Sequence, residues 1–376
     1  MTVTYPEHWS ELETTLCHDW LTGMRGGERV LELLCDGFPD ADICTLIHNR
    51  DAVSDRINRH TIHTSPLQRL PNINSGYRNF LPFFPTMINS FTPRSGDLVI
   101  STSHCVAKSL RASPETKHLC YCFTPMRYAW LFQDAYFGRR SAKSLVISPI
   151  LAGLRRWDRQ TATRVTHFVA ISKAVQQRIQ DFYGRASDLV YPPIDVDRFH
   201  ITADSQRESF DLIVSALVPY KRIDLAVEVY NRLGTPLRIV GVGGELQRLK
   251  AMAADNITFL EWQSDDVITT QYETCRQLIF PGEEDFGLVP LEAQACGTPV
   301  IAYGCGGALE TVENGKTGLH FSEQSVDSLT EAVLAGADTP WDRSHIRKHA
   351  EAFGIQQFID GMNASIERCM SASGPI

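Results

Sequence analysis

The sequence predicts an α/β protein built from two doubly wound domains, and three observations carry this prediction. The 376 residues exceed the usual length of a single domain. Apolar runs of strand length alternate with helix-like segments in both halves, and this order produces parallel sheets. The doubled proline Pro192-Pro193 interrupts the alternation and opens a polar segment at 194–209, so the domain boundary is expected there.

The N-terminal half starts with a strand expected at 14–18, followed by a glycine-containing loop and a helical pattern. A loop of this kind binds phosphate through backbone N–H groups, which makes Gly26 and Gly27 candidate binding residues. Their spacing matches neither GxGxxG nor a P-loop, so a plain turn between strand and helix is an equal alternative. Five more strands are expected in this half, at 41–47, 97–101, 117–122, 166–171 and 189–191, and the doubled proline ends the last of them.

An aromatic, proline-broken segment at 66–85 interrupts this order. Proline removes a backbone donor and fixes the local conformation, so the segment is expected to be neither a long helix nor an inner strand. We favour a buried connection over an exposed apolar patch that meets lipid.

The alternation of strands and helices restarts beyond the boundary. The predicted domains are 1–195 and 196–352, with a helical segment at 353–376 that is expected to cross back to the first domain. Strands are expected at 212–216, 237–242, 257–260, 277–280, 299–303 and 317–321, and helices at 223–233, 244–254, 266–275 and 325–334.

The composition is that of a globular protein, with 43% hydrophobic and 21% charged residues. The longest apolar runs are far shorter than the roughly 20 residues of a membrane span, and the polar start of the chain has no signal-peptide pattern. Ten cysteines are scattered without a zinc-ligand spacing, and the close pair Cys120 and Cys122 fits alternate positions of a strand. A reduced, cytoplasmic setting is therefore expected.

The charge is divided unevenly between the two halves. Residues 1–195 hold 22 Lys and Arg against 18 Asp and Glu, whereas residues 196–376 hold 14 against 26. An ordinary solvated surface explains this as well as an anionic partner of the N-terminal half does. Such a partner would be a phosphorylated acceptor or an anionic membrane surface contacted peripherally; nucleic acid is not among the expected partners.

Two consecutive turns in the C-terminal half are expected to meet ligands. An acidic turn at 283–285 follows one apolar run, and a glycine turn at 304–307 follows the next. In a doubly wound domain both turns lie at the carboxyl ends of parallel strands, where ligands bind. The helices that start there offer free N–H groups to anions.

The stretch from Glu284 to Ala302 resembles the signature of the family-4 retaining glycosyltransferases, and Glu284 and Glu292 match the spacing of that family's paired glutamates. The resemblance extends from about residue 13 to 335 and implies the GT-B architecture, in which two Rossmann-like domains face each other across a cleft. Other matching stretches lie at 191–195, 218–224 and 306–312, and those at 18–20, 26–29 and 124–130 resemble a subset rich in bacterial polysaccharide mannosyltransferases.

The resemblance implies how the C-terminal domain holds a nucleotide sugar. Glu284 would contact hydroxyls of the transferred sugar beside the backbone of Phe286-Gly287-Leu288, and Glu292 would hold the ribose. Carboxylates suit both tasks because they accept hydrogen bonds from paired hydroxyls. Lys221 would neutralise the diphosphate, whose charge grows as the glycosidic bond breaks.

Two positions depart from the family pattern. Many relatives carry an arginine five residues before the lysine, but this chain has Ala216, so Arg222 is the candidate for a second cation. Relatives commonly have a histidine just before the Thr-Pro, but this chain has Phe123, which offers no hydrogen bond to a sugar. Gly26 and Gly27 would face the diphosphate from the other domain.

The expected function is transfer of a hexose with retention of configuration, with mannose from GDP-mannose favoured and a UDP-sugar as the alternative. The acceptor would be a glycan or a lipid-linked sugar in polysaccharide biosynthesis.

No metal or other cofactor is expected, because the spaced pair Asp195 and Asp197 lies in the linker rather than at a strand end. A non-catalytic sugar-nucleotide-binding member is a second alternative. A dehydrogenase is disfavoured, because the loop at 241–244 lacks the third glycine of GxGxxG.

Overall fold

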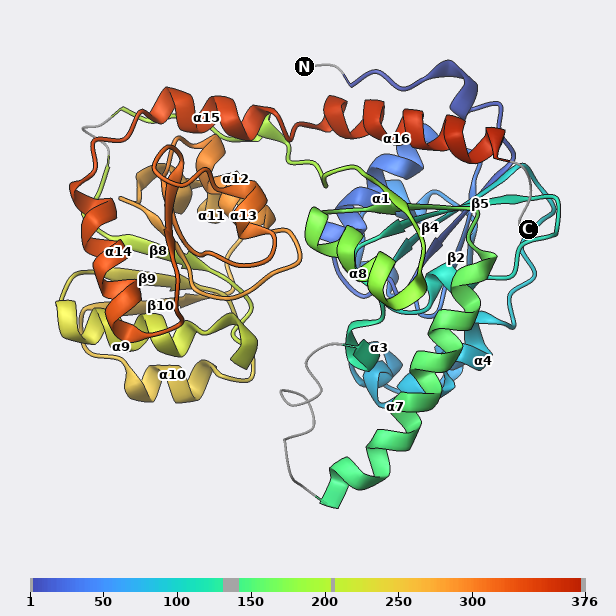
Figure 1. Cartoon of the computed structure of the whole chain (residues 1–376), viewed down its shortest axis with the longest axis horizontal. Helices are drawn as coiled ribbons and strands as arrows, with labels where there is room; N and C mark the ends of the chain where they lie inside the picture. Colours follow the sequence, from blue (N-terminus) through green and yellow to red (C-terminus); the bar gives the residue numbers. More distant parts are fainter. Residues whose placement is uncertain (1–2, 131–141, 204–206, 373–376) are drawn as a thin grey trace. The chain divides into compact units, whose positions relative to one another are not determined.

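The computed structural model describes residues 3–130, 142–203 and 207–372. The chain forms two compact units (Figure 1). The N-terminal unit comprises Thr2–Pro192 and Phe358–Ile376, and the C-terminal unit comprises Pro193–Gln357. The sequence had placed these boundaries at 195 and 352.

The N-terminal unit is built on a seven-stranded parallel sheet in the order β3-β2-β1-β4-β5-β6-β7. The order reverses between β1 and β4, which makes their carboxyl ends the topological switch point of a doubly wound sheet. The strands span Thr14–His18 (β1), Asp42–Thr45 (β2), Ile62–Thr64 (β3), Leu98–Ser103 (β4), Lys117–Cys122 (β5), His167–Ala170 (β6) and Ser187–Leu189 (β7).

Strand β3 was not predicted, because its three residues are only partly buried or exposed and form no continuous apolar run. The α-helices of this unit are Gly26–Gly37 (α1), Asp55–Asn58 (α2), Ile73–Gly76 (α3), Phe84–Ile88 (α4), Arg127–Trp130 (α5), Ala142–Thr161 (α7), Lys173–Tyr183 (α8) and, from its fourth residue, Ile355–Ser371 (α16).

The C-terminal helix α16 packs on the N-terminal unit. Arg368 pairs with Asp188 at 2.7 Å, and Asn363 accepts a hydrogen bond from the indole of Trp9 at 2.9 Å. The ring of Phe358 packs edge-on against Tyr121. Most of the last helix thus belongs to the N-terminal unit, although the C-terminal unit lies between this helix and the rest of the N-terminal unit in the sequence.

The aromatic segment at 66–85 folds as consecutive short helical turns. In chain order they are the 3-10 helix Pro66–Arg69, α3, the 3-10 helix Tyr77–Phe83 and α4. Tyr77 and Phe84 are buried against Trp20, so the expected buried connection is confirmed for these side chains. Phe83 remains 57% exposed.

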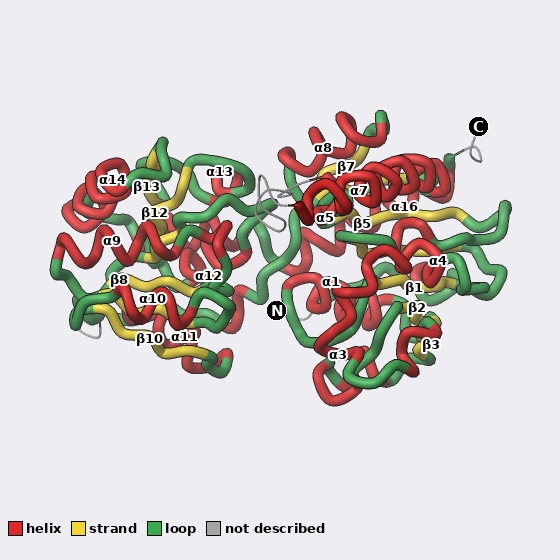
Figure 2. The backbone as a smooth tube through the Cα atoms, turned by 90° about the horizontal axis from the view of Figure 1, so that it is seen from below, coloured by secondary structure: helices red, strands yellow, loops and turns green. Residues whose placement is uncertain are grey.

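The C-terminal unit repeats the architecture with a six-stranded parallel sheet in the order β10-β9-β8-β11-β12-β13 (Figure 2). Its switch point lies between β8 and β11. The strands span Asp211–Val214 (β8), Leu237–Val240 (β9), Ile257–Glu261 (β10), Leu278–Phe280 (β11), Val300–Tyr303 (β12) and Gly318–Phe321 (β13).

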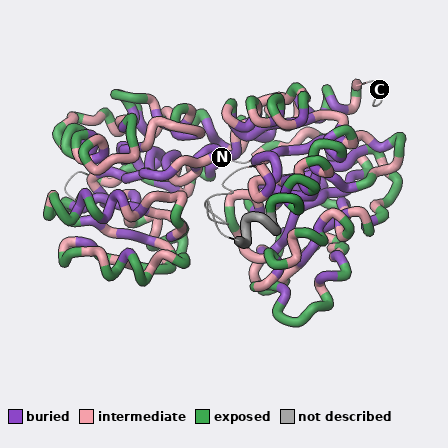
Figure 3. Tube along the Cα trace, turned by 60° about the horizontal axis from the view of Figure 1, so that its bottom comes forward, coloured by how far each residue is buried: buried purple, intermediate pink, exposed green. Residues whose placement is uncertain are grey.

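The strands β1, β4 and β11 are buried along their whole length, and buried chain runs through the middle of both units (Figure 3). Parallel strands covered by helices on both faces need continuous apolar runs, and this is why the sequence reveals them. The two-domain α/β prediction is confirmed. The α-helices of the C-terminal unit are Ile223–Leu233 (α9), Leu246–Met252 (α10), Asp265–Thr274 (α11), Leu288–Ala295 (α12), Ala308–Thr311 (α13), Val326–Asp338 (α14) and Arg343–Glu351 (α15).

Candidate active site

Lys221 and Glu284 lie on the two sides of the switch point of the C-terminal sheet. Lys221 ends the 3-10 turn Pro219–Lys221 that follows β8, and Glu284 lies in the acidic turn after the neighbouring strand β11. The Lys221 ammonium donates to the Glu284 carboxylate and forms an ion pair with it. Both side chains are mostly buried, at 13% and 24% exposed, so the structure brings these two predicted site residues together.

Glycines hold the backbone of the acidic turn close to its neighbours. A Cβ on Gly282 would lie 2.8 Å from the Cα of Lys221, and one on Gly307 would lie 2.2 Å from the Cα of Phe286. The N–H of Gly307 donates to the carbonyl of Glu284 at 2.8 Å. Because only glycine permits these approaches, the glycine turn after β12 fixes where Glu284 lies.

Helix α12 begins at the predicted donor-binding segment. Gly287, at φ +102, is its N-cap, and Leu288 is its first residue. Phe286 is buried, with its ring 5.9 Å from that of Phe353. The start of α12 therefore directs backbone N–H groups toward the same edge of the sheet as Lys221 and Glu284, where they favour an anion.

Glu292 lies in the second turn of α12 and is held by a residue that the sequence did not single out. The hydroxyl of Tyr272, on α11, donates to its carboxylate at 2.9 Å. Tyr272 is fully buried, and burial raises the pKa of its phenol well above the usual value, with the Glu292 charge adding to the effect. A tyrosine in an amphipathic helix carries no sequence signal for this contact.

Arg222 makes contacts inside the C-terminal unit. It caps α9 at φ +53, and its guanidinium lies 3.3 Å from Asp224 and 3.2 Å from the side chain of Gln324. Gln324 in turn donates to the carbonyl of Pro281 at 2.9 Å. Arg222 thus ties the turn after β8 to the acidic turn, while Ala216, the other departure from pattern, is exposed.

Gly26 and Gly27 lie at the switch point of the N-terminal sheet, where they start α1 directly after the loop from β1. A Cβ on Gly27 would lie 3.2 Å from the ring of Phe123, so no larger residue fits there without displacing that ring. Phe123 thus lies beside the expected phosphate-binding glycines.

Two buried titratable groups lie beneath this loop. Burial lowers the pKa of His18 to about 4 and raises the pKa of Glu28 to about 7. The imidazole lies 4.0 Å from the Glu28 carboxylate, and its Nδ1 lies 2.7 Å from the hydroxyl of Thr102. The histidine is therefore neutral at neutral pH.

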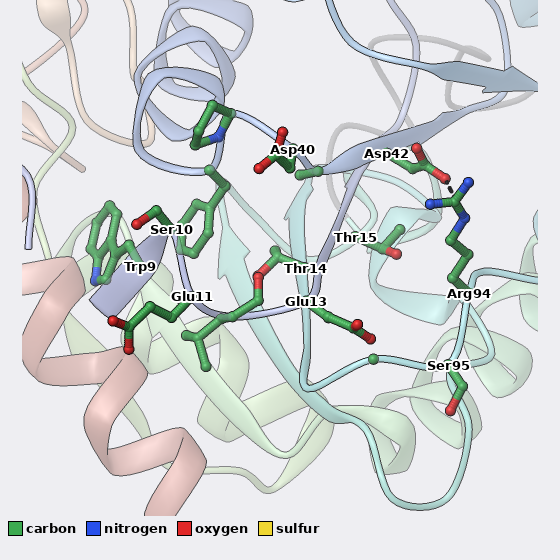
Figure 4. A pocket seen from close by; sticks show the side chains of 15 residues that line it. Trp9, Ser10, Glu11, Glu13, Thr14, Thr15, Asp40, Asp42, Arg94 and Ser95 are labelled. Carbon is green, nitrogen blue, oxygen red and sulfur yellow. Dashed lines mark hydrogen bonds and ion pairs between the residues drawn. The ribbon is translucent and has the colours of Figure 1, made fainter. Parts of the chain in front are cut away.

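The described side chains also contain a cavity of about 300 Å³ at the opposite edge of the N-terminal sheet (Figure 4). It is lined by residues around the amino ends of β1, β2 and β4, among them Thr15, Asp40 and Asp42, with Arg94 3.4 Å from Asp42. None of the predicted site residues lines this cavity.

Three observations concern metals, thiols and membranes. Within 3–130, 142–203 and 207–372, no group of three or more His, Cys, Asp or Glu is arranged to hold a metal ion, and metal independence stays a prediction. All ten cysteines are free thiols, and all but the partly buried Cys305 are buried. Among the helices of the described residues, none combines the length and apolarity that a membrane crossing requires.

Comparison with known proteins agrees with this geometry. Residues 198–353 match the family described as glycosyl transferases group 1. The chain is 31% identical over 246 residues to a D-inositol 3-phosphate glycosyltransferase of Rhodococcus erythropolis, covering 56% of this chain and 55% of that protein. It is 32% identical over 237 residues to a GDP-mannose-dependent alpha-(1-6)-phosphatidylinositol monomannoside mannosyltransferase of Mycobacterium tuberculosis, covering 52% and 62%.

The fold is shared more widely than the sequence. A solved lipopolysaccharide outer core galactosyltransferase in its apo form superposes with a TM-score of 0.67 over 95% of this chain and 99% of that chain, at 16% identity. The chain spans only about half the length of the first curated relatives it matches. The sequence resemblance and the two Rossmann-like units are confirmed: the match to group 1 glycosyl transferases covers most of the C-terminal unit, and the chain is similar to a GDP-mannose-dependent mannosyltransferase.

Proposed function

We propose that this protein is a retaining glycosyltransferase that moves a hexose from a nucleotide sugar to a glycan or lipid-linked acceptor in polysaccharide biosynthesis. The observation that carries the proposal is the pairing of Lys221 with Glu284 at the switch point of a group 1 glycosyl transferase domain. Mannose from GDP-mannose is the favoured donor, supported by the likeness to a GDP-mannose-dependent relative. A UDP-sugar is the alternative.

Each predicted residue has a chemical task in this proposal. The Lys221 ammonium balances the charge that develops on the departing diphosphate, which lowers the barrier because the cation is already in place. The Glu284 carboxylate accepts hydrogen bonds from hydroxyls of the transferred sugar, and Glu292, oriented by Tyr272, accepts those of the ribose. The leaving phosphate takes the acceptor proton, so no protein nucleophile and no metal ion is required.

A nucleotide thermal-shift screen tests the proposal directly. A ligand at 100 times its dissociation constant adds about 2.7 kcal/mol to stability, so GDP should raise the melting temperature while NAD leaves it unchanged. A response to UDP alone would move the donor to a UDP-sugar. Binding of GDP-mannose without transfer to any acceptor or to water would favour the non-catalytic alternative, for which Phe123 and Ala216 are the relevant departures.

We also propose a cytoplasmic location with peripheral contact between the N-terminal unit and an anionic membrane. The exposed ring of Phe83 and the exposed Arg156 and Arg159 of α7 support this, because an anionic membrane surface attracts exposed cations and takes up exposed apolar side chains. Arg139 and Arg140, which precede α7 in the sequence and were part of the same predicted contact, lie outside the described residues. Phe83→Asp should reduce sedimentation with phosphatidylglycerol vesicles, and unchanged sedimentation would refute this contact.

A further inference from the structure

Asp19 and His104 form a fixed dyad at the switch point of the N-terminal sheet. Asp19 follows β1 and is completely buried. One of its oxygens accepts the backbone N–H groups of His104 and Cys105 at 2.7 and 2.9 Å, and the other accepts those of Val106 and Ala107 at 2.6 and 2.8 Å. Four backbone donors fix the orientation of this carboxylate.

The imidazole of His104 is positioned by the same carboxylate. Its Nδ1 lies 3.1 Å from Asp19 Oδ2, so a proton on Nδ1 is favoured electrostatically over a lone pair that would face the carboxylate. The ring of Trp20 packs edge-on against it, with the centroids 4.5 Å apart. The side chain is nevertheless 29% exposed, and in the described part of the chain Nε2 has no hydrogen-bond partner.

The surroundings keep this imidazole neutral. Burial lowers the pKa of His104, and the positive charges of Arg127, Arg25 and Arg78 add to that effect, while the Asp19 charge opposes it. A neutral imidazole protonated on Nδ1 presents a lone pair on Nε2. The exposed side of His104 is therefore a hydrogen-bond acceptor rather than a cation.

His104 lies beside Phe123, whose ring cannot form a hydrogen bond with a sugar hydroxyl. The ring centroids of His104 and Phe123 are 6.4 Å apart, and the Phe123 ring lies beside Gly27, the second residue of α1. We propose that Nε2 of His104 accepts a hydrogen bond from a sugar hydroxyl held at the carboxyl edge of the N-terminal sheet, with Asp19 as its positioning residue. This inference rests on the proposed glycosyl transfer and adds to it a substrate-binding group in the N-terminal unit.

Nitrogen NMR of the histidine-labelled chain tests the proposal, with the His104 signals identified by their loss in His104→Gln. The signals should show a neutral ring protonated on Nδ1, the less common tautomer in water. Titration with methyl α-mannoside should shift the Nε2 signal if the hydroxyl belongs to the acceptor. A shift with GDP-mannose but not with GDP or the methyl glycoside would assign the hydroxyl to the transferred sugar.

Kinetics provide a second measurement. His104→Leu, which has no acceptor, should lower transfer about tenfold or more, as expected for loss of a substrate hydrogen bond, without changing the GDP thermal shift. His63→Leu, at a half-exposed edge-strand histidine, is the matched control and should transfer normally. If no sugar shifts the Nε2 signal and His104→Leu transfers normally, this inference is overturned, while GDP binding would still support the proposed function. Absence of any nucleotide response would instead refute the proposed function.

Discussion

Lys221 and Glu284, 63 residues apart in the sequence, form an ion pair with each other at the carboxyl ends of adjacent strands. In the proposed reaction the ammonium balances the charge of the diphosphate, and the carboxylate accepts hydrogen bonds from the transferred sugar. Both groups are mostly buried, so each charge influences how strongly the other binds a ligand. The proposed reaction therefore couples donor binding and catalysis through this pair.

Glu284→Gln and Lys221→Ala should each reduce transfer by roughly 100-fold or more, but they should change GDP affinity in opposite directions. Removal of the carboxylate frees the ammonium and removes repulsion of the diphosphate, so Glu284→Gln should bind GDP more tightly. Lys221→Ala removes the cation and should bind it less tightly. Turnover assays with calorimetric titration of GDP measure both effects.

The exposed Glu331 and Lys348 offer matched controls for these substitutions. Glu331→Gln and Lys348→Ala should leave transfer and GDP affinity unchanged. Full activity in Glu284→Gln and Lys221→Ala would refute the transferase assignment. Equal GDP affinities in these two variants would show that the ion pair does not couple binding to catalysis.

Tyr272→Phe should weaken donor binding through Glu292. The substitution removes a buried hydrogen bond to a carboxylate, which costs about 1.5–3 kcal/mol, and it leaves Glu292 free to turn away from the ribose. GDP affinity should fall, whereas the affinity for 2′,3′-dideoxy-GDP, which lacks the ribose hydroxyls, should change little. Tyr230→Phe is the control, because Tyr230 is an equally buried tyrosine that donates to Asp211.

Gly307→Ala should displace the acidic turn. The added Cβ would lie 2.2 Å from the Cα and the carbonyl oxygen of Phe286, and backbone atoms on both sides have little room to move. Overpacking of this kind costs about 1–3 kcal/mol, so the melting temperature and GDP binding should both fall. Gly244→Ala has nothing within 4 Å of the added Cβ and should behave like the parent; comparable losses in both would argue against close packing as the cause.

Glu28→Gln should change the pH dependence of stability. Burial raises the pKa of Glu28 from 4.5 to about 7, so as the pH rises the unfolded chain releases this proton before the folded chain does. The free energy of unfolding should therefore fall between pH 4.5 and 7, by about 3 kcal/mol at most. Glutamine keeps the neutral form, so the melting temperature of Glu28→Gln relative to the parent should rise from pH 5 to pH 8; a constant difference would contradict the argument.

Chelation should leave transfer unchanged, because the proposed reaction uses Lys221 and helix N–H groups instead of a metal ion to balance the diphosphate. Initial rates measured with and without EDTA provide the test. Loss of activity that is restored by a divalent ion would refute metal independence.

Much of the fold follows from local sequence patterns. The strands at 14–18 and 117–122 and the helix at 223–233 were predicted with the bounds that the structure shows. Buried parallel strands need continuous apolar runs, and helices need an apolar stripe. These elements can therefore be recognised from a few consecutive residues. The three-residue strand β3 was missed because it is too short and too polar to produce such a pattern.

The sequence by itself determined the two α/β units and, through its resemblance to the family-4 glycosyltransferases, implied the chemistry expected of one of them. Only the tertiary structure decided which side chains meet: Lys221 with Glu284, Tyr272 with Glu292, and Asp19 with His104, 85 residues further along the chain. Element type is set by periodicity and turn residues that act over a few positions. Contacts at a switch point depend on strand order, which is fixed by the packing of the whole sheet and has no local signature.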